Sequence, residues 1–591
     1  MESKVIIESR FEDKEKLDLE TTTSTNPSPK SPTAYLSITS IVIGYIAALE
    51  IASLPPVIQA TTNTRLGLRS YYWWIALAEI ATSVFAWSVA GSLGDQYGRR
   101  NILAVGNLIA LIGAIVGATA HSVWVVVLGQ AILGLGAGCQ FQAVAIISEI
   151  FRHKHRSLVQ GLLTISPFPF IACGQLIGTA MATHATWRWV FYLNIVLSGI
   201  ALVMTLLFYR PPVDRTLRPT TILHIDYVGI LLYAVLNLPN QRSRKLANLS
   251  QLFLAGVALC FGWTGFGTYG WGNSAVLVSL CLALLFIVLL VLWDFTKAKN
   301  PMWPPVVLGN GRGFLTVIVV ATFESFALFS MSTIFTGQIS ALYSTDPYRV
   351  GVDVLPYGIA SVVGMLAAGL FMRKIRHTNL QLAVLCFVLT VFVGVMATLT
   401  PKSVKSGLAF TCLGGFAVGW IMILLVVMVQ FGSPNRLIGT STGLLNLART
   451  VGQAMGIGFY QTIIRSRVGA TLVKRVAGAV LPLGLPATSL PDLLIAIASG
   501  NQAAIMKVPG INLKIIEAAV LETKLTYAAA FRIVYYVGMV GGIISTIFAL
   551  FTKDVTPFMM GAEGEHLAVD IGGSKRPFLP LFPKEKQVQR K

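Results

Sequence analysis

Charged residues are scarce in this chain. Only 12% of its 591 residues are Asp, Glu, Lys or Arg, against roughly 25% in an ordinary soluble domain, and 54% are hydrophobic. So few charges cannot cover the surface of a soluble particle. The apolar residues also fall into runs of about 20, each long enough to cross roughly 30 Å of hydrocarbon as a helix. The composition therefore predicts an all-α integral membrane protein.

Motifs of several other protein classes are missing. The chain contains no Gly-Lys dipeptide, and hence no phosphate-binding loop of an ATP-driven pump. Its seven histidines form no H-E-x-x-H pattern, and its six cysteines are not paired at the spacing of a zinc site. The formal charge of +20 lies in short clusters and in the tails, which argues against nucleic-acid binding. We expect no enzyme activity, no cofactor, no metal and no nucleic-acid partner.

About fourteen apolar runs are long enough to be transmembrane helices. Residues 35–209 and residues 313–551 each predict a bundle of about six helices, and the linker at 210–312 carries an inserted helix pair. Residues 1–34, rich in Ser, Thr and Pro, predict a disordered tail, and residues 552–591 form a second tail. An even number of spans places both tails on the same side of the membrane.

The short loops predict which side that is. Lys and Arg are concentrated in one set of loops, for example at Arg99 and Arg100, and the loops that retain such cations face the cytoplasm. Both tails are therefore predicted to be cytoplasmic, and a long loop at residues 465–526 to be external. Its apolar stretch at residues 490–497 is too short to cross the membrane and predicts a surface or interfacial helix.

One polar segment, residues 237–251, interrupts the predicted seventh span. It contains Pro239, Arg242, Arg244 and Lys245. Charges at membrane depth cost of order 3 kcal/mol each, so this segment cannot cross hydrocarbon unaided. It is either a polar loop between two half-helices or an insertion that a working copy of the protein lacks, and the cost favours the insertion.

Four ionisable residues lie well inside predicted spans. They are Glu50, Glu79, Glu324 and Arg449. Residues of this kind are usually functional or paired, and transporter sites lie near the membrane midplane. Arg449 could simply neutralise one carboxylate and hold helices together. Because one cation cannot satisfy three carboxylates, we expect at least one to bind protons, with Glu79 or Glu324 first and Glu50 third.

Two further patterns concern helix faces. Asn446, Arg449 and Gln453 are spaced i, i+3 and i+7, which places them on one stripe of a helix and predicts that they face a wet cavity. Small residues in the fourth and fifth spans predict close helix packing. The packing positions are the glycines Gly134, Gly138, Gly174 and Gly178, together with the neighbouring Gln175.

The strongest local motif, GSLGDQYGRR at residues 91–100, lies between the second and third spans. Gly91 and Gly98 allow close backbone approach. Asp95 can accept hydrogen bonds at a neighbouring helix N-terminus, while Arg99 and Arg100 can donate to carboxylates. Such a charged contact can form and break as two bundles rock. The alternative is an ordinary positively charged loop.

This motif is similar to the signature of the major facilitator superfamily, and with fourteen spans the chain resembles its drug:proton antiporter branch. The segments TWRWVFYLN (186–194), DYVG (226–229) and YGW (269–271) are most similar to the fungal trichothecene efflux pumps. The resemblance implies two bundles around a central cavity and proton-coupled export of a small amphipathic organic substrate such as a toxin, drug or secondary metabolite. It further implies protons and the lipid bilayer as partners, a monomer, and the plasma membrane, with the vacuolar membrane as the alternative.

The chain departs from that branch in two places. Gln130 stands where such antiporters carry an arginine four residues before a Gly-x-Gly step, and Gly174-Gln175 stands where they carry Gly-Pro. Two other functions are kept open. One is a siderophore-iron importer of the same fold, because similar fourteen-span proteins serve that role. The other, from another class, is a membrane sensor that does not transport, which the absent arginine and the interrupted seventh span motivate.

Overall fold

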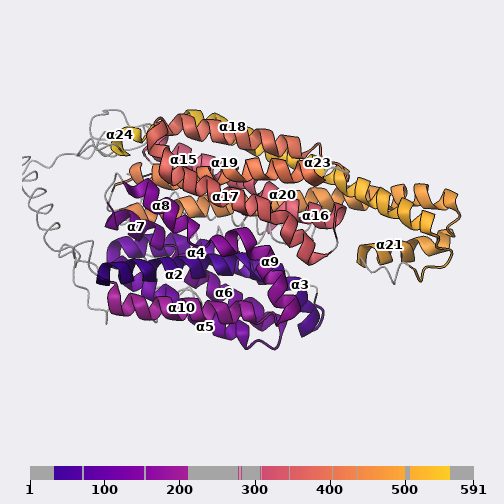
Figure 1. The fold of residues 1–591 in the computed structure, drawn as a ribbon, viewed down its shortest axis with the longest axis horizontal. Coiled ribbons are helices and arrows are strands. Elements are labelled where there is room, and N and C mark those ends of the chain that lie inside the picture. The colour runs from indigo at the N-terminus through magenta and orange to yellow at the C-terminus, as the bar shows by residue number, and fades with distance from the viewer. Residues whose placement is uncertain are drawn as a thin grey trace, which may run out of the picture.

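Every element in the part of the chain that the structure describes is a helix (Figure 1). The structure, a computed structural model, describes residues 32–69, 72, 74–151, 155–210, 274, 277–278, 281, 307, 309–344, 346–401, 404–434, 437–499 and 506–559. Eleven helical stretches in this part are long and apolar enough to cross a membrane. The polar segment 237–251 and nearly all of the predicted seventh and eighth spans lie outside the described residues, so the count of fourteen stays a prediction.

The helices form two groups that lie side by side (Figure 1). The first group contains α2 (Pro32–Ser53), α3 (Pro55–Leu66), α4 (Trp74–Tyr97), α5 (Arg99–Ala118), α6 (Val123–Gln140), α7 (Ala143–Ile150), α8 (Arg156–Ile165), α9 (Phe168–His184) and α10 (Trp189–Phe208). The second contains η4 (Gly311–Leu315), α15 (Thr316–Phe329), η5 (Ser330–Ile334), α16 (Phe335–Leu342), α17 (Pro347–Ile375), α18 (Thr378–Met396), α19 (Val404–Phe431), α20 (Ile438–Val480), α23 (Leu513–Leu550) and α24 (Thr556–Met559). These groups are the two bundles that the apolar runs predicted.

Proline divides two of the predicted spans into pairs of helices. α2 and α3 meet at Leu54, directly before Pro55, and α8 and α9 meet at Pro167. Proline has no amide hydrogen, and its ring clashes with the carbonyl four residues earlier, so helical hydrogen bonding is interrupted. α17 is different, because it continues through Pro356.

Both bundles have their helix termini at two common ends. One end, at the left of Figure 1, holds the junction of α4 and α5, the start of α2 and the end of α23; we call it the motif end. The other end holds α3 and the far ends of α20 and α23, and we call it the opposite end. The motif end thus holds the loop with Arg99 and Arg100, one of the cation-rich loops that the charge pattern predicts to face the cytoplasm.

The largest contacts between the bundles pair α4 with α20, and α17 with α8 and α9. Small residues allow the backbones to approach. A Cβ atom built on Gly161 of α8 would lie 3.1 Å from the Cα atom of Gly369 on α17, and one on Gly358 would lie 2.5 Å from the Cα atom of Ala172 on α9. Close approach of this kind increases van der Waals contact between helices.

The segment 465–526, expected to be a loop, is largely helical. α20 continues to Val480 and α23 begins at Leu513, so both helices extend past the bundle at the opposite end (Figure 1). α21 (Leu490–Ser499) lies beside these extensions and shares a small apolar core with them, in which Leu493 is fully buried. We call residues 465–526 the projection. The membrane-surface position expected for its short helix stays a prediction.

Candidate functional site

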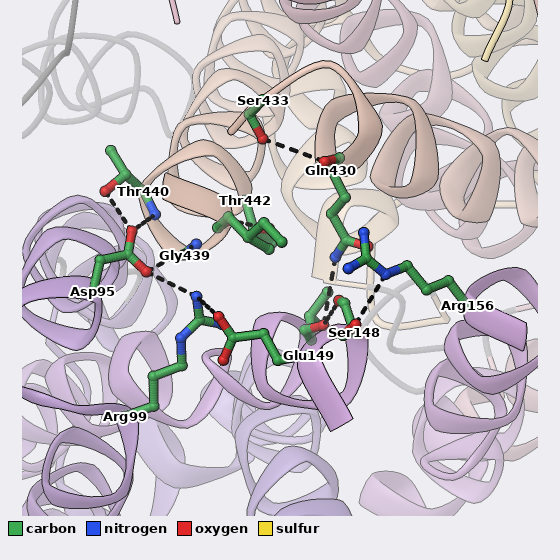
Figure 2. Close-up of polar contacts among 12 residues, drawn as sticks. Asp95, Arg99, Ser148, Glu149, Arg156, Gln430, Ser433, Gly439, Thr440 and Thr442 are labelled. Atoms are coloured by element: carbon green, nitrogen blue, oxygen red, sulfur yellow. Dashed lines mark hydrogen bonds and ion pairs between the residues drawn. The ribbon is translucent and has the colours of Figure 1, made fainter. Parts of the chain in front are cut away.

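The motif between α4 and α5 connects the two bundles at the motif end (Figure 2). The carboxylate of Asp95, at the end of α4, accepts hydrogen bonds from the backbone amides of Gly439 (3.2 Å) and Thr440 (2.8 Å). It also accepts one from the Thr440 hydroxyl at 2.8 Å. A helix N-terminus carries unpaired amides and a positive partial charge, so the carboxylate binds the start of α20 across the bundle interface. Asp95 thus makes the contact that the sequence predicted.

Arg99 contacts the same carboxylate from the first bundle. Its Nη2 atom lies 2.8 Å from Asp95 and 2.7 Å from Glu149 at the end of α7. The Arg99 and Asp95 side chains are only 7% and 4% exposed, so salt screens this pair less than a surface pair. Arg100 instead donates to the backbone oxygen of Leu206 at 2.8 Å. We call Asp95, Arg99 and Glu149, together with the start of α20, the latch.

The sequence alone suggests that Glu149, at the end of the fourth span, pairs with Arg156. In the structure Glu149 forms its ion pair with Arg99 instead, while Nε of Arg156 donates to the backbone oxygen of Ser148 at 2.9 Å. α7 ends at Ile150 and is followed by the extended residue Phe151, while α8 begins at Arg156. Glu149 therefore points toward α5, and Arg156 returns to the end of α7.

Two of the motif glycines occupy positions that disfavour any other residue, one because of a close contact and one because of its backbone conformation. A Cβ atom on Gly91 would lie 2.6 Å from the backbone oxygen of Gly439, at the crossing of α4 and α20. Gly98 has φ +91°, in the left-handed region that residues other than glycine rarely adopt. The first glycine allows the bundles to touch, and the second turns the chain from α4 into α5.

Glu50 belongs to a buried polar chain that sequence reasoning missed. Asn194 of α10 donates to the Glu50 carboxylate at 2.8 Å, and Ser198 donates to Asn194 at 3.1 Å. Further amide and hydroxyl side chains of α5, α6 and α10 continue the chain: Gln140, Asn107 and Thr205. The available signal was the i, i+4 spacing of Asn194 and Ser198 in an otherwise apolar helix.

Glu79 lies on α4 where this helix packs against α6. A Cβ atom on Gly134 would overlap the backbone of Glu79 and the hydroxyl of Thr82, so the predicted packing role fits this glycine. Thr82 and Ser83, one turn along from Glu79, donate to backbone carbonyls of their own helix. Glu79 keeps 7% of its surface exposed, whereas Glu50 and Glu324 keep none.

Glu324 and Arg449 interact electrostatically in the second bundle, on α15 and α20. Glu324 accepts a hydrogen bond from Ser325 at 3.2 Å, and Arg449 donates to the backbone oxygen of Met422 at 2.9 Å. Within the described residues, neither forms a contact ion pair, and Oε1 of Glu324 and Nε of Arg449 have no hydrogen-bond partner. Both groups therefore keep unused hydrogen-bonding capacity at the centre of the molecule.

The remaining predicted residues are spread over the helices around this centre. Asn446 and Gln453, like Arg449, are partly exposed, while Gly452 of the same helix packs on the carbonyl of Thr322. In the first bundle, a Cβ atom on Gly138 would overlap Ala86. Gly174 and Gly178 face the α2–α3 junction, and Gln175, beside them on α9, is partly exposed.

An aromatic group on the first bundle was also missed. The ring centroids of Tyr45 and Phe141 lie 5.4 Å apart, and those of Phe141 and Trp87 lie 5.3 Å apart. Tyr45 lies within electrostatic range of Arg449, and a Cβ atom on Gly443 would lie 2.6 Å from the Trp87 carbonyl. This aromatic group therefore lies near α20, and it combines apolar surface with polar groups at the boundary between the bundles.

Comparison with known proteins agrees with this architecture. The model of the fungal trichothecene efflux pump family (TRI12) matches residues 16–571. The trichothecene efflux pump of Fusarium sporotrichioides is 25% identical over 482 residues, which cover 79% of this chain and 77% of that protein. Multidrug resistance protein 3 of Bacillus subtilis is 23% identical, covering 72% of this chain and 79% of the relative.

The human organic anion transporter MFSD10 superposes with a TM-score of 0.49 at 12% identity, covering 86% of this chain and all of that one. The family model covers nearly the whole sequence and includes the latch, both bundles and the projection. The chain therefore belongs to the fungal trichothecene efflux pump family, a family of major facilitator transporters.

Proposed function

We propose that this protein exports a small amphipathic organic molecule, a toxin, drug or secondary metabolite, in exchange for protons. The observation that carries the proposal is the contact of Asp95 with the start of α20, because it joins two bundles through groups that can separate without breaking either bundle. Family membership supports the substrate class, since relatives are named as trichothecene and multidrug efflux proteins.

The latch gives the transport cycle a defined closed state. With Asp95 on α20 and Gly91 against Gly439, the bundles touch at the motif end. Opening that end requires the carboxylate to leave the helix N-terminus and become hydrated. Charge compensation at a helix N-terminus contributes about 0.3–1 kcal/mol at exposed sites and more when buried, which is small enough for reversible switching.

Protons would couple to this motion through a buried carboxylate. Glu79 and Glu324 are the first candidates and Glu50 is the third, because Asn194 already holds Glu50 within its own bundle. Glu79 lies on the same helix as Asp95, so a change at one can be transmitted along α4 to the other. Glu324 lies beside Arg449, whose charge responds directly to protonation of that carboxylate.

The charge pattern supports the orientation, with the motif end and both tails facing the cytoplasm. The proposal also includes a monomer in the plasma membrane, with the vacuolar membrane as the alternative. The motif end is closed in this structure. In an exporter of this orientation, cargo leaves by the opposite end, on the external side.

The experiment uses vesicles that contain the purified protein, with an imposed pH gradient and a labelled trichothecene or a fluorescent drug. We expect uphill movement of cargo with the wild type and a loss of at least about tenfold in pH-driven accumulation with Glu79→Gln or Glu324→Gln. Glu517→Gln, on the exposed face of the projection, is the matched control. Unchanged coupling in both core variants removes these two carriers, cargo moving inward identifies an importer, and binding without flux identifies a sensor.

A further inference from the structure

Three cations gather at the turn between α17 and α18. Arg373, Lys374 and Arg376 lie within four residues of one another, and none of them pairs with a carboxylate in the part of the chain that the structure describes. Lys374 and Arg376 are exposed, and Arg373 is half-buried. The turn lies at the motif end, because Thr378 at the start of α18 binds Asp554 just after α23. We call the three side chains the cation cluster.

The corresponding turn of the first bundle uses its charges differently. The two turns share three positions at the same spacing, which are Gly91, Asp95 and Gly98 in the first bundle and Gly369, Arg373 and Arg376 in the second. Both turns contain a left-handed residue at the third position, with φ +91° at Gly98 and φ +61° at Arg376. The guanidinium of Arg373 has no acceptor atom, so it cannot bind helix amides as the carboxylate of Asp95 does. The second turn is therefore not a copy of the latch, and its cations are available to a ligand outside the protein.

Other side chains fix this turn and leave the cations exposed. The amide of Gln381 donates to the backbone oxygens of Met372 at 2.9 Å and Arg376 at 2.7 Å. Cations near a helix C-terminus often bind these last carbonyls, but here Gln381 binds them. Asp554 lies 3.6 Å from His377 and forms no ion pair with the cluster. The positive charge of the cluster is therefore not neutralised by the residues that the structure describes around it.

An exposed apolar row on α17 leads to the cluster. Ile359, Val363, Leu366 and Leu370 are 41–50% exposed, and their spacing of three or four residues places them in line with Lys374. We call these four side chains the apolar stripe. From residue 359 to residue 374 the helix rises about 22 Å, which exceeds the roughly 15 Å of hydrocarbon in one leaflet. An acyl chain of that leaflet can therefore lie along the stripe and end at the cluster.

Lys374 connects the stripe to the cluster. Its Nζ atom lies 5.4 Å from the ring centroid of Phe371, a side chain that is 45% exposed at the same end of the helix. This contact keeps the ammonium group beside apolar surface. Long cationic side chains at the ends of membrane helices extend to the level of the lipid headgroups. An anionic group bound by Lys374 therefore lies at headgroup depth, at the end of the stripe.

We propose that the cation cluster and the apolar stripe form a binding site for an anionic phospholipid of the cytoplasmic leaflet. Arg373 and Lys374 bind the phosphate, Arg376 binds a second acidic group of the headgroup, and an acyl chain lies along the stripe. Anionic lipids are concentrated in that leaflet and attract basic residues close to its surface. The stripe distinguishes a lipid from free phosphate, which needs no apolar surface. This inference goes beyond the export of cargo, and it requires only that the motif end faces the cytoplasm.

The test measures lipid binding to the purified full chain in detergent by native mass spectrometry, with phosphatidylserine and phosphatidylcholine as probes. We expect the wild type to bind phosphatidylserine at least about tenfold more tightly than phosphatidylcholine. Arg373→Gln/Lys374→Gln removes two cations and should weaken phosphatidylserine binding by about tenfold or more, with phosphatidylcholine binding unchanged. Lys374→Gln alone repeats the test if the double variant does not fold, with an expected loss of about three- to fivefold.

Arg210→Gln/Arg312→Gln is the matched control, because it removes two exposed cations from other positions at the same end of the molecule. It should retain phosphatidylserine binding within about twofold of the wild type, since charges farther away than a Debye length are screened. An excess of inorganic phosphate should leave the lipid bound.

The proposal is overturned if the two lipids bind equally well, or if the variants of the cluster bind phosphatidylserine like the wild type. It is also overturned if the control loses as much affinity, which would show a diffuse attraction to the whole motif end, or if inorganic phosphate displaces the lipid. Lipid binding requires neither cargo nor a pH gradient, so this result is separate from success or failure of the transport assay.

Discussion

At the scale of single residues, two carboxylates at the motif end each accept hydrogen bonds at the start of a helix. Asp95 accepts hydrogen bonds at the start of α20, across the bundle interface. Asp554, in the segment after α23, accepts them from the amide and hydroxyl of Thr378 at the start of α18, at 2.9 and 2.7 Å. The second contact lies within one bundle. A carboxylate at a helix N-terminus therefore serves a moving interface in one place and a fixed junction in the other.

The fixed junction gives a stability prediction. Burial alone would raise the pKa of Asp554, but hydrogen bonds from Thr556 and Thr378 outweigh it and lower the pKa. A carboxylate whose pKa is lower in the folded state stabilises the fold above its unfolded pKa of about 3.9, and this stability is lost as the pH falls through the folded value. We expect Asp554→Asn to reduce the free energy of unfolding by about 1 kcal/mol at pH 7.

Thermal unfolding of the purified protein in detergent checks this. Asp492→Asn, at an exposed position on the projection, is the control and should leave the melting temperature unchanged. The difference between wild type and Asp554→Asn should hold down to about pH 4 and narrow as the pH falls below that, through the lowered pKa of the folded state. A constant difference across that range would show that the carboxylate charge is not the cause.

The contacts of a residue could be predicted where one short sequence motif held all the information needed. The partner type of Asp95 followed from a short loop motif, because a carboxylate beside two glycines fits a helix terminus. The partner of Glu149 did not follow, because it depends on the direction in which α7 ends. Asn194 was missed since a single amide in an apolar run gives no sign of its partner until α2 and α10 are packed together.

At the scale of helices, apolar runs located the spans, but their ends depended on other features. The structure interrupts two of the spans at Pro55 and Pro167, where the missing proline amide ends the helical hydrogen bonding. α20 and α23 were placed correctly within the second bundle, yet both continue well into the segment expected to be a loop. Their extensions are too polar for a membrane and are stabilised by packing on each other, which a hydropathy pattern does not report.

The crossing of α4 and α20 gives a prediction at this scale. Gly91→Val introduces a side chain where a Cβ atom alone would lie 2.6 Å from the Gly439 oxygen, so the helices cannot approach at the motif end. We expect export in vesicles or intact cells to fall by at least about tenfold, because overpacking of one methylene or more costs about 1–3 kcal/mol and selects the open state. Gly94→Ala is the control on the same helix, since its Cβ atom would lie 3.5 Å from its nearest neighbours. Normal export by Gly91→Val would show that this crossing need not close.

At the scale of the whole molecule, the apolar cores are divided unevenly. One large core includes the second bundle and the motif end, a smaller one fills the first bundle toward the opposite end, and a third lies in the projection alone. The two-bundle plan could be predicted from the sequence because it follows from the spacing of apolar runs. The contacts between bundles could not, since they are made by glycines and single polar groups whose partners lie hundreds of residues away.

The separate core of the projection leads to a prediction for the molecule as a whole. Its members lie between Val476 and Ala519, and none of the candidate site residues belongs to it. Replacing residues 472–519 by a short glycine-rich turn should therefore leave the bundles folded and export within about twofold of the wild type, because the packing of α20 against α4 and α15 is retained. Export and thermal unfolding are measured together on the same preparation. A shortened protein that unfolds at the wild-type temperature but no longer exports would place the projection on the path of the cargo, and the exposed cations of its helices would then be the next positions to change.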